Sequence, residues 1–195
     1  MDTCSIQELV YFDPNRPSAP FIKQLLVAML SVIVNNFLFN FIYRLLPKSE
    51  SLYTDTKQEY TTIQGKAVTP ILFGISEIVN GGIYAPFVEE LFFRFFIFKI
   101  IMIKIFRMSE FRGNLLQSII FGLMHMTNVI TSPQSVNKTI LQTISAAIGG
   151  YLSAWTYIYT NSIFTPIMAH MINNLIATGS EIFEYSLFYK QITSQ

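Results

Sequence analysis

The chain has 195 residues, of which 51% are hydrophobic and only 13% charged, whereas average soluble domains carry about 25% charged residues. This composition excludes an ordinary soluble domain, and the net charge of +1 gives no reason to expect a nucleic-acid partner. A single cysteine, Cys4, excludes an internal disulfide and a cysteine-based zinc site. We therefore expect an all-α, multi-pass membrane helix bundle that contacts the lipid bilayer.

The apolar segments predict one transmembrane domain over residues 21–188, between a polar N-terminal tail (1–20) and a C-terminal tail (189–195). About five to six transmembrane helices are expected, several of them near the ~20 residues needed to cross the hydrocarbon core. Their expected ranges are 21–46, 67–83, 86–106, 114–129, 136–159 and 163–188, with a polar loop at 48–66. The segment 67–83 contains Pro70 and Glu77, so it is either a short span or a re-entrant element.

Polar and small residues predict how two of these helices pack. The first helix carries Asn35, Asn36 and Asn40, whose amides suggest a face that pairs across helices inside the bundle. The helix at 136–159 contains Ser-Ala-Ala-Ile-Gly-Gly at 145–150, and small residues allow helix backbones to approach closely.

Three charged residues, Glu89, Glu90 and Arg94, lie in one of the most apolar stretches of the chain. A charge at membrane depth costs roughly 2.5–3.5 kcal/mol even on the gentler insertion scales, so such residues are functional by default. Residues four apart share a helix face, which predicts an ion pair between Glu90 and Arg94. Glu89 lacks an intrahelical partner and is expected to be a free carboxylate suited to general-base chemistry. The structural alternative is a packing network or a set of interfacial charges.

The two histidines, His125 and His170, lie in other apolar segments. His125 shares a helix face with Phe121, and its structural alternative is a core histidine bonded to a backbone carbonyl or another helix. His170 and Asn174 are four apart and present two hydrogen-bond donors on one face, which suits a developing oxyanion. Their structural alternative is a hydrogen-bonded pair that joins helices. Asn173 points elsewhere and is the less favoured amide.

Together these residues place a base candidate, a histidine and a donor pair on three helices, with offsets that let them face one cavity. This is the inventory for attack by an activated water on a carbonyl. The chain lacks His-Glu-x-x-His and Gly-x-Ser-x-Gly, so neither a zincin-type metalloprotease nor a covalent serine acyl-enzyme is indicated. We expect the site within residues 85–177 and without a cofactor. A zinc ion ligated by the histidines and glutamates is the alternative.

Three motifs in this order resemble the CAAX protease and bacteriocin-processing family, also called CPBP or Abi. They are Glu-Glu-x-x-x-Arg at 89–94, Phe-x-x-x-His at 121–125 and His-x-x-x-Asn at 170–174. The resemblance covers about residues 85–177, including the stretches 149–154 and 161–166, and residues 1–84 carry no family signal beyond hydrophobicity.

The resemblance implies an intramembrane endopeptidase of a compact prokaryotic type in a bacterial cell membrane. Its expected substrate is a small pheromone- or bacteriocin-like peptide precursor or a CAAX-type C-terminus. By position, Glu89 and His125 would activate the water, and His170 with Asn174 would stabilise the oxyanion. The supporting residues implied in the same way are Glu90, Arg94 and Phe121.

Two non-proteolytic functions remain open from the residues alone. The chain could be a membrane immunity protein or scaffold of the same family that binds a peptide or protein without cleaving it. It could also be a small proton-coupled transporter, which intramembrane carboxylates suit, although we find no repeat symmetry between its halves.

Overall fold

The computed structural model describes residues 6–45, 68–131 and 136–193. In these three ranges the chain forms helices and no strand, which confirms the all-α fold. Two segments, η1 and η2, have π-type turns, and η3 is a 3-10 turn. The elements are α1 (Ile6–Val10), α2 (Phe21–Leu45), α4 (Pro70–Ser76), η1 (Glu77–Tyr84), α5 (Ala85–Glu90), η2 (Leu91–Ile105), α6 (Glu110–Met124), η3 (His125–Thr127), α7 (Asn128–Thr131), α8 (Val136–Thr160) and α9 (Phe164–Thr193). The predicted loop at 48–66 and Cys4 lie outside the described residues.

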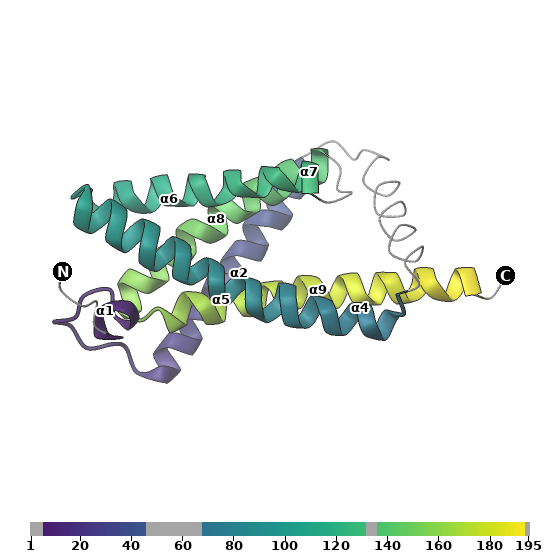
Figure 1. Cartoon of the computed structure of the whole chain (residues 1–195), viewed down its shortest axis with the longest axis horizontal. Coiled ribbons are helices and arrows are strands. Elements are labelled where there is room, and N and C mark those ends of the chain that lie inside the picture. Colours follow the sequence, from purple (N-terminus) through teal and green to yellow (C-terminus); the bar gives the residue numbers. More distant parts are fainter. Residues whose placement is uncertain (1–5, 46–67, 132–135, 194–195) are drawn as a thin grey trace.

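The helices form two layers that the segment α4–η2 connects. Figure 1 shows α6 and α8 side by side, α9 running along α4 and α5, and α2 crossing the bundle to contact both α8 and α9. The first part of the segment, α4 to α5, packs on α9, whereas η2 packs on α6. The end of α5 therefore lies where the chain changes from one packing partner to the other.

One continuous helical rod, residues 70–105, replaces the two separate segments expected at 67–83 and 86–106. Pro86 lies inside this rod, so the prediction that it starts a helix was wrong. A proline breaks a regular α-helix because its ring clashes with the carbonyl four residues back and its N–H is missing. Here the preceding turns are wider, with the Ala85 N–H donated to the Asn80 carbonyl five residues back. Such π-type turns make room for the ring, and the helix continues.

The helix expected at 114–129 is shifted toward the N-terminus. It begins at Glu110 because Ser109 caps it, the Ser109 hydroxyl accepting from the Arg112 N–H at 3.4 Å. It ends at Met124, and the chain continues as the tight turn η3 and the short helix α7. His125 therefore lies at the C-terminal end of α6, as the first residue of η3.

The remaining helix predictions agree with α2, α8 and α9 to within a few residues, except that α9 continues to Thr193. Small residues bring α6 and α8 together, as predicted. A Cβ added at Gly150 would lie 3.0 Å from Phe121 Cδ1, and one at Gly122 would lie 2.7 Å from the Thr143 carbonyl oxygen. The two backbones thus touch where the glycines lie.

The asparagines of α2 only partly follow the prediction of an inward face. Asn35 and Asn36 donate to Asn173 Oδ1 of α9 at 3.3 and 3.0 Å, which confirms their pairing across helices. Asn40 is exposed and donates to the Asn36 carbonyl of its own helix, so its placement inside the bundle was wrong. The inward face ends before the last turns of α2.

The N-terminal residues pack onto the bundle at the end opposite to the end of α9 (Figure 1). The Phe12 ring lies 5.8 Å from the Phe98 ring and 5.4 Å from the Tyr157 ring, between centroids. Asn161, in the turn between α8 and α9, accepts from the Asp13 N–H at 2.7 Å and donates to the Asp13 carbonyl at 2.9 Å. These contacts fix the start of the chain to the turn that leads into α9.

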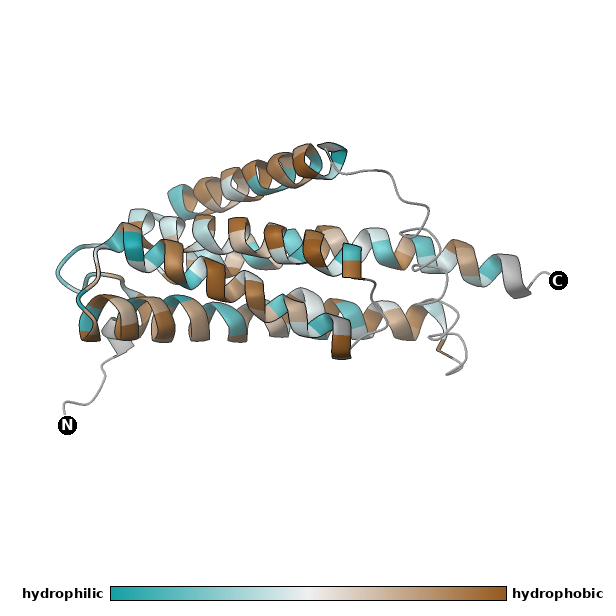
Figure 2. Ribbon diagram, turned by 90° about the horizontal axis from the view of Figure 1, so that it is seen from above, coloured by the Kyte–Doolittle hydropathy of each residue, from teal (hydrophilic) through white to brown (hydrophobic). Residues whose placement is uncertain are grey.

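Hydrophobic residues, brown in the ribbon of Figure 2, occur along all the long helices, and many of their large apolar side chains are exposed. Large apolar residues such as Ile33, Phe92 and Ile119 are exposed on three different helices, an arrangement typical of a lipid-facing surface. Among the helices that the structure describes, one, Phe21–Arg44, is long and apolar enough to cross a membrane by length and composition, with a mean hydropathy of 2.1.

Candidate active site

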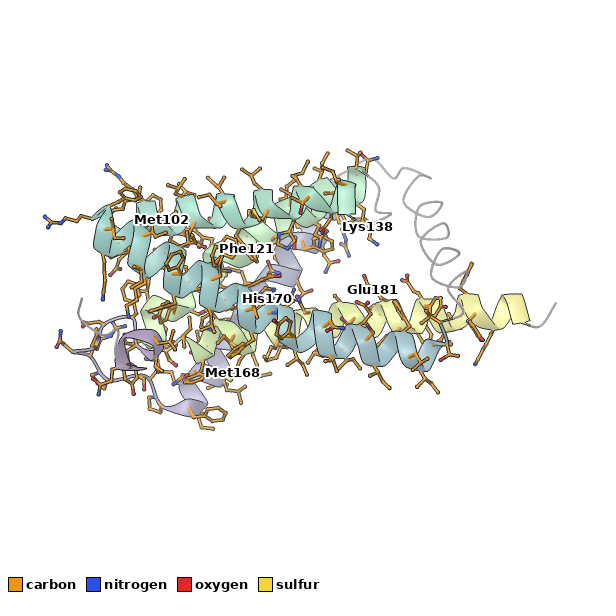
Figure 3. The ribbon with its side chains drawn as sticks, viewed as in Figure 1. Met102, Phe121, Lys138, Met168, His170 and Glu181 are labelled. Carbon is orange, nitrogen blue, oxygen red and sulfur yellow. The ribbon has the colours of Figure 1, made fainter. Side chains whose placement is uncertain are left out.

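Phe121 of α6 lies at the centre of the predicted site residues. Figure 3 shows Phe121 and His170, from α6 and α9, near each other in the middle of the molecule, and their ring centroids are 5.9 Å apart. The His125 ring lies 5.0 Å from the Phe121 ring, also edge to face. The Arg94 guanidinium carbon lies 4.6 Å above the same ring, a distance at which cation–π attraction is significant. One aromatic ring thus contacts both histidines and the arginine.

Glu90 and Arg94 form the predicted ion pair, and both side chains are fully buried. Arg94 Nη2 donates to Glu90 Oε1 at 3.0 Å. The Nε and Oε2 atoms are also 2.9 Å apart, although without the alignment of a hydrogen bond. A buried charge left without its partner is strongly destabilising, so the pair is a structural requirement for the end of α5.

The same carboxylate binds His170, with Glu90 Oε1 and His170 Nδ1 2.8 Å apart. A carboxylate paired with arginine can only accept a hydrogen bond, so the proton of this contact belongs to His170 Nδ1. The other ring nitrogen, Nε2, faces Glu89, whose Oε2 lies 3.9 Å away. Glu90 therefore sets both the orientation and the tautomer of His170, the usual task of a carboxylate behind a functional histidine.

Glu89 is partly exposed, at 34%, and its Oε2 lies 3.9 Å from His170 Nε2, which is too long for a hydrogen bond, so its role as a free general base stays a prediction. Its neighbour His170 comes from α9, 81 residues later in the chain. The spacing rule could not identify this neighbour, because it compares positions within one helix and says nothing about the next helix that packs on it.

A cavity of about 240 Å³ opens beside Glu89 and His125. A water molecule takes about 30 Å³, so the space accommodates a water together with part of a peptide. The residues that line the cavity are Glu89, Phe93, Phe121, Met124, His125, Thr127 and Asn128. The two residues predicted to activate water thus share one cavity.

His125 is held by its own helix. Its Nδ1 lies 2.9 Å from the Phe121 carbonyl oxygen, and a carbonyl only accepts, so Nδ1 carries the proton. In the neutral ring Nε2 then carries a lone pair that can accept a proton. The structural alternative, a histidine bonded to a backbone carbonyl, is therefore observed. This hydrogen bond uses only Nδ1, so the lone pair of Nε2 is not engaged by Phe121.

The two asparagines at 173 and 174 take different directions, as their spacing predicts. Asn174 shares the His170 face but donates to the Gly81 carbonyl of η1 at 2.9 Å. Asn173 points to α2, where it accepts from Asn35 and Asn36. For Asn174 the structure shows the helix-joining hydrogen bond, and its role at an oxyanion stays a prediction.

Sequence reasoning missed Gln117, which is fully buried on α6 and accepts from Arg94 Nη1 at 2.9 Å. The sequence does contain a signal for this residue: a polar side chain four residues before Phe121, on the same face of an apolar helix.

The donor set does not fit a zinc ion. Among the described residues, no three histidine, cysteine or acidic side chains come together as metal ligands. The Glu90 carboxylate is occupied by Arg94 and by His170 Nδ1, so it is not open to a metal.

The comparison with family models gives a match that includes all three motifs. A family model described as type II CAAX prenyl endopeptidase Rce1-like matches residues 70–176, more than half of the chain. The chain belongs to the Rce1-like family. This is a family of membrane-embedded proteases, so the match confirms the predicted resemblance. It also supports the general assignment of the chain as a hydrolase.

The Rce1-like match begins at residue 70, so the statement that residues before 85 carry no family signal was wrong for α4 and η1. These turns hold Gly81, the acceptor of Asn174, and so contribute to the surroundings of the site. No curated protein and no solved structure matches the chain.

Proposed function

We propose that this Rce1-like protein is an intramembrane endopeptidase of the CPBP type that spans a bacterial cell membrane several times and hydrolyses a peptide bond with an activated water. One observation carries the proposal: Glu89 and His125, from different helices, line the same cavity of about 240 Å³. Each residue offers a proton acceptor: Glu89 has a carboxylate oxygen, and His125 has the Nε2 lone pair. A water between two such acceptors is polarised for attack on a carbonyl carbon.

The reaction runs in two steps. Water forms a bond to the scissile carbonyl carbon, gives one proton to Glu89 while its other O–H donates a hydrogen bond to His125 Nε2, and produces a tetrahedral oxyanion. The C–N bond then breaks as that proton passes from Glu89 to the leaving amine, which restores the carboxylate. No covalent enzyme intermediate and no metal takes part in this balance.

The oxyanion is expected to form beside α9. In the neutral tautomer that Glu90 sets, His170 Nε2 carries a lone pair, so it donates to an oxyanion only after taking up a proton. Glu89, with Oε2 3.9 Å from Nε2, shares with this nitrogen the proton taken from water and takes it back for the leaving amine when the C–N bond breaks. Asn174 must exchange the Gly81 carbonyl for the oxyanion when substrate binds, a tightening of geometry that is common on going from a free enzyme to its complex.

The cavity wall favours a mostly apolar peptide. Phe93, Phe121 and Met124 supply its apolar surface, and Thr127 with Asn128 supplies polar groups near the turn after α6. Such a wall suits a prenylated CAAX-type C-terminus or a hydrophobic peptide precursor of the pheromone or bacteriocin type. A lipid-borne substrate would reach it from the surrounding bilayer.

The test uses the full chain in proteoliposomes with quenched fluorescent peptides: a farnesylated CAAX peptide, its unprenylated form and a hydrophobic precursor peptide. Glu89→Gln keeps the shape of the side chain and removes the base, so the rate should fall by about 10²–10⁴. Glu110→Gln, at the exposed start of α6, is the matched control and should cleave at the wild-type rate.

Two results would reject the proposal: cleavage of none of the three peptides by the wild type, or equal cleavage by Glu89→Gln. A scaffold or immunity protein that binds without cutting would keep its cellular phenotype in Glu89→Gln. A protease would lose that phenotype together with cleavage.

A further inference from the structure

Gln117 joins α6 and α8 to the buried pair of Glu90 and Arg94. Its side chain is fully buried, and its Oε1 accepts from Arg94 Nη1 at 2.9 Å. Its Nε2 donates to Asn114 Oδ1 and to the Gly150 carbonyl, both at 3.0 Å. All the hydrogen-bonding groups of this side chain except one lone pair are therefore engaged.

The chemistry of the neighbours fixes the direction of every bond in this network. A guanidinium only donates, so the Gln117 atom that faces Arg94 must be the carbonyl oxygen. Its amide nitrogen then faces two acceptors, the Gly150 carbonyl and Asn114 Oδ1. The Asn114 amide nitrogen in turn donates to the Tyr151 carbonyl at 3.1 Å. Neither a carboxylate nor an apolar side chain supplies this combination of one acceptor and two donors.

We propose that Gln117 is a positioning residue for His170, which it reaches through Arg94 and Glu90; this inference rests on the proposed function. Gln117 holds one arm of the guanidinium, the other arm and Nε face Glu90, and Glu90 Oε1 binds His170 Nδ1. The backbone of α8 thus fixes which nitrogen of His170 carries the proton and where Nε2 points. The family motifs contain the last three residues of this relay but not Gln117.

Loss of the Gln117 amide has a defined consequence. In Gln117→Met, Arg94 Nη1 loses its acceptor, while the Gly150 carbonyl and Asn114 Oδ1 lose their donor. Because a buried unpaired donor is costly, the guanidinium turns toward these vacated acceptors and away from Glu90. Glu90 then no longer holds His170 Nδ1 in one geometry, and His170 samples both tautomers.

The experiment measures the histidines directly. The chain has only two, so ¹⁵N-histidine labelling of the full chain in micelles gives two imidazoles, which a His125→Gln variant assigns. In Gln117→Met, the His170 nitrogen signals should shift toward a mixture of tautomers, whereas His125, held by the Phe121 carbonyl, should keep its signals. In the peptide assay kcat should fall about 10²-fold, the effect of a misplacement near 1 Å, with KM unchanged. Ser118→Ala is the control. It removes the hydrogen bond from the Ser118 hydroxyl to the Leu115 carbonyl within α6 and should alter neither readout.

Unchanged His170 signals in a folded Gln117→Met protein overturn the inference, even if activity falls, because a merely structural residue would lower activity without moving the tautomer. A moved tautomer with wild-type kcat overturns it as well. If Gln117→Met does not fold, Gln117→Asn, which keeps the amide on a shorter side chain, is measured against the same outcomes. If the wild type cleaves no peptide, the proposed function fails, and the His170 signals alone decide whether Gln117 positions this ring.

Discussion

Gly122 on α6 is the position at which one added methyl group should disturb the site most without touching a reacting group. A Cβ at this position would lie 2.7 Å from the Thr143 carbonyl oxygen, 2.8 Å from Ala147 Cβ and 3.1 Å from the Ala147 nitrogen. Carbon atoms in contact prefer about 3.5–4.0 Å, so α6 and α8 must separate locally by about 0.7 Å or more. Two of the three neighbours are backbone atoms, and no rotamer change relieves the overlap.

We expect Gly122→Ala to lower the free energy of unfolding by about 1–3 kcal/mol, the usual effect of overpacking. Phe121 precedes Gly122 in the chain and contacts both histidine rings, so the shift moves His125 relative to Glu89 as well. A displacement of this size near a reacting geometry lowers the rate by up to about 10²-fold. Unfolding in mixed micelles, followed by circular dichroism, and the quenched-peptide assay measure the two effects.

Gly179 on α9 provides the matched control, because no heavy atom lies within 4 Å of an added Cβ. Gly179→Ala should raise the free energy of unfolding by about 0.5–1 kcal/mol, since alanine favours a helix interior over glycine, and should leave the rate unchanged. Wild-type stability and rate in Gly122→Ala would show that α6 and α8 do not touch at this point, and the proposed dependence of the site on their contact would be wrong.

Three further outcomes follow from the site. Asn174→Ala should lower kcat by about 10²–10³ with its helices intact by circular dichroism, the typical cost of one oxyanion donor; wild-type kcat would refute the oxyanion role. Arg94→Met leaves the Glu90 carboxylate buried without its partner and should lower the free energy of unfolding by about 3–5 kcal/mol, whereas combining it with Glu90→Gln should recover much of this loss. Peptide cleavage should be unaffected by excess EDTA, and chelator-sensitive activity that zinc restores would instead support the metal-dependent alternative.

The sequence predicted contacts within a helix better than contacts between helices. Glu90 and Arg94 are four apart, and the periodicity of one helix is enough to place them together. The neighbour of Glu89 could not be found in this way, because His170 reaches it only through the packing of α9 on α5. The same limit applies to Asn174, since its spacing gives its face but not the Gly81 carbonyl that it meets there.

The rod of residues 70–105 shows a second limit. Gly81, Gly82 and Pro86 are residues that normally interrupt a helix, so the sequence pattern favours two separate helices here. The structure keeps one helix by widening its turns, and that choice depends on the continuous packing of the rod on α9 and then on α6. Helix ends with a local cause leave a signal in the sequence, such as Ser109, which the expected range of 114–129 overlooked. A proline tolerated by tertiary packing leaves no such signal.

The adjacent glutamates differ in environment because one imidazole lies between them. Glu90 is fully buried and meets Nδ1 of His170, whereas Glu89 is about one-third exposed and faces Nε2 of the same ring. Two carboxylates at consecutive positions point about 100° apart on a helix, and here they lie beside the two nitrogens of one ring. The buried member pairs with Arg94 and holds the ring, whereas the exposed member lines the cavity. In the proposed mechanism the tandem Glu-Glu would therefore combine a positioning group and a base in a single turn.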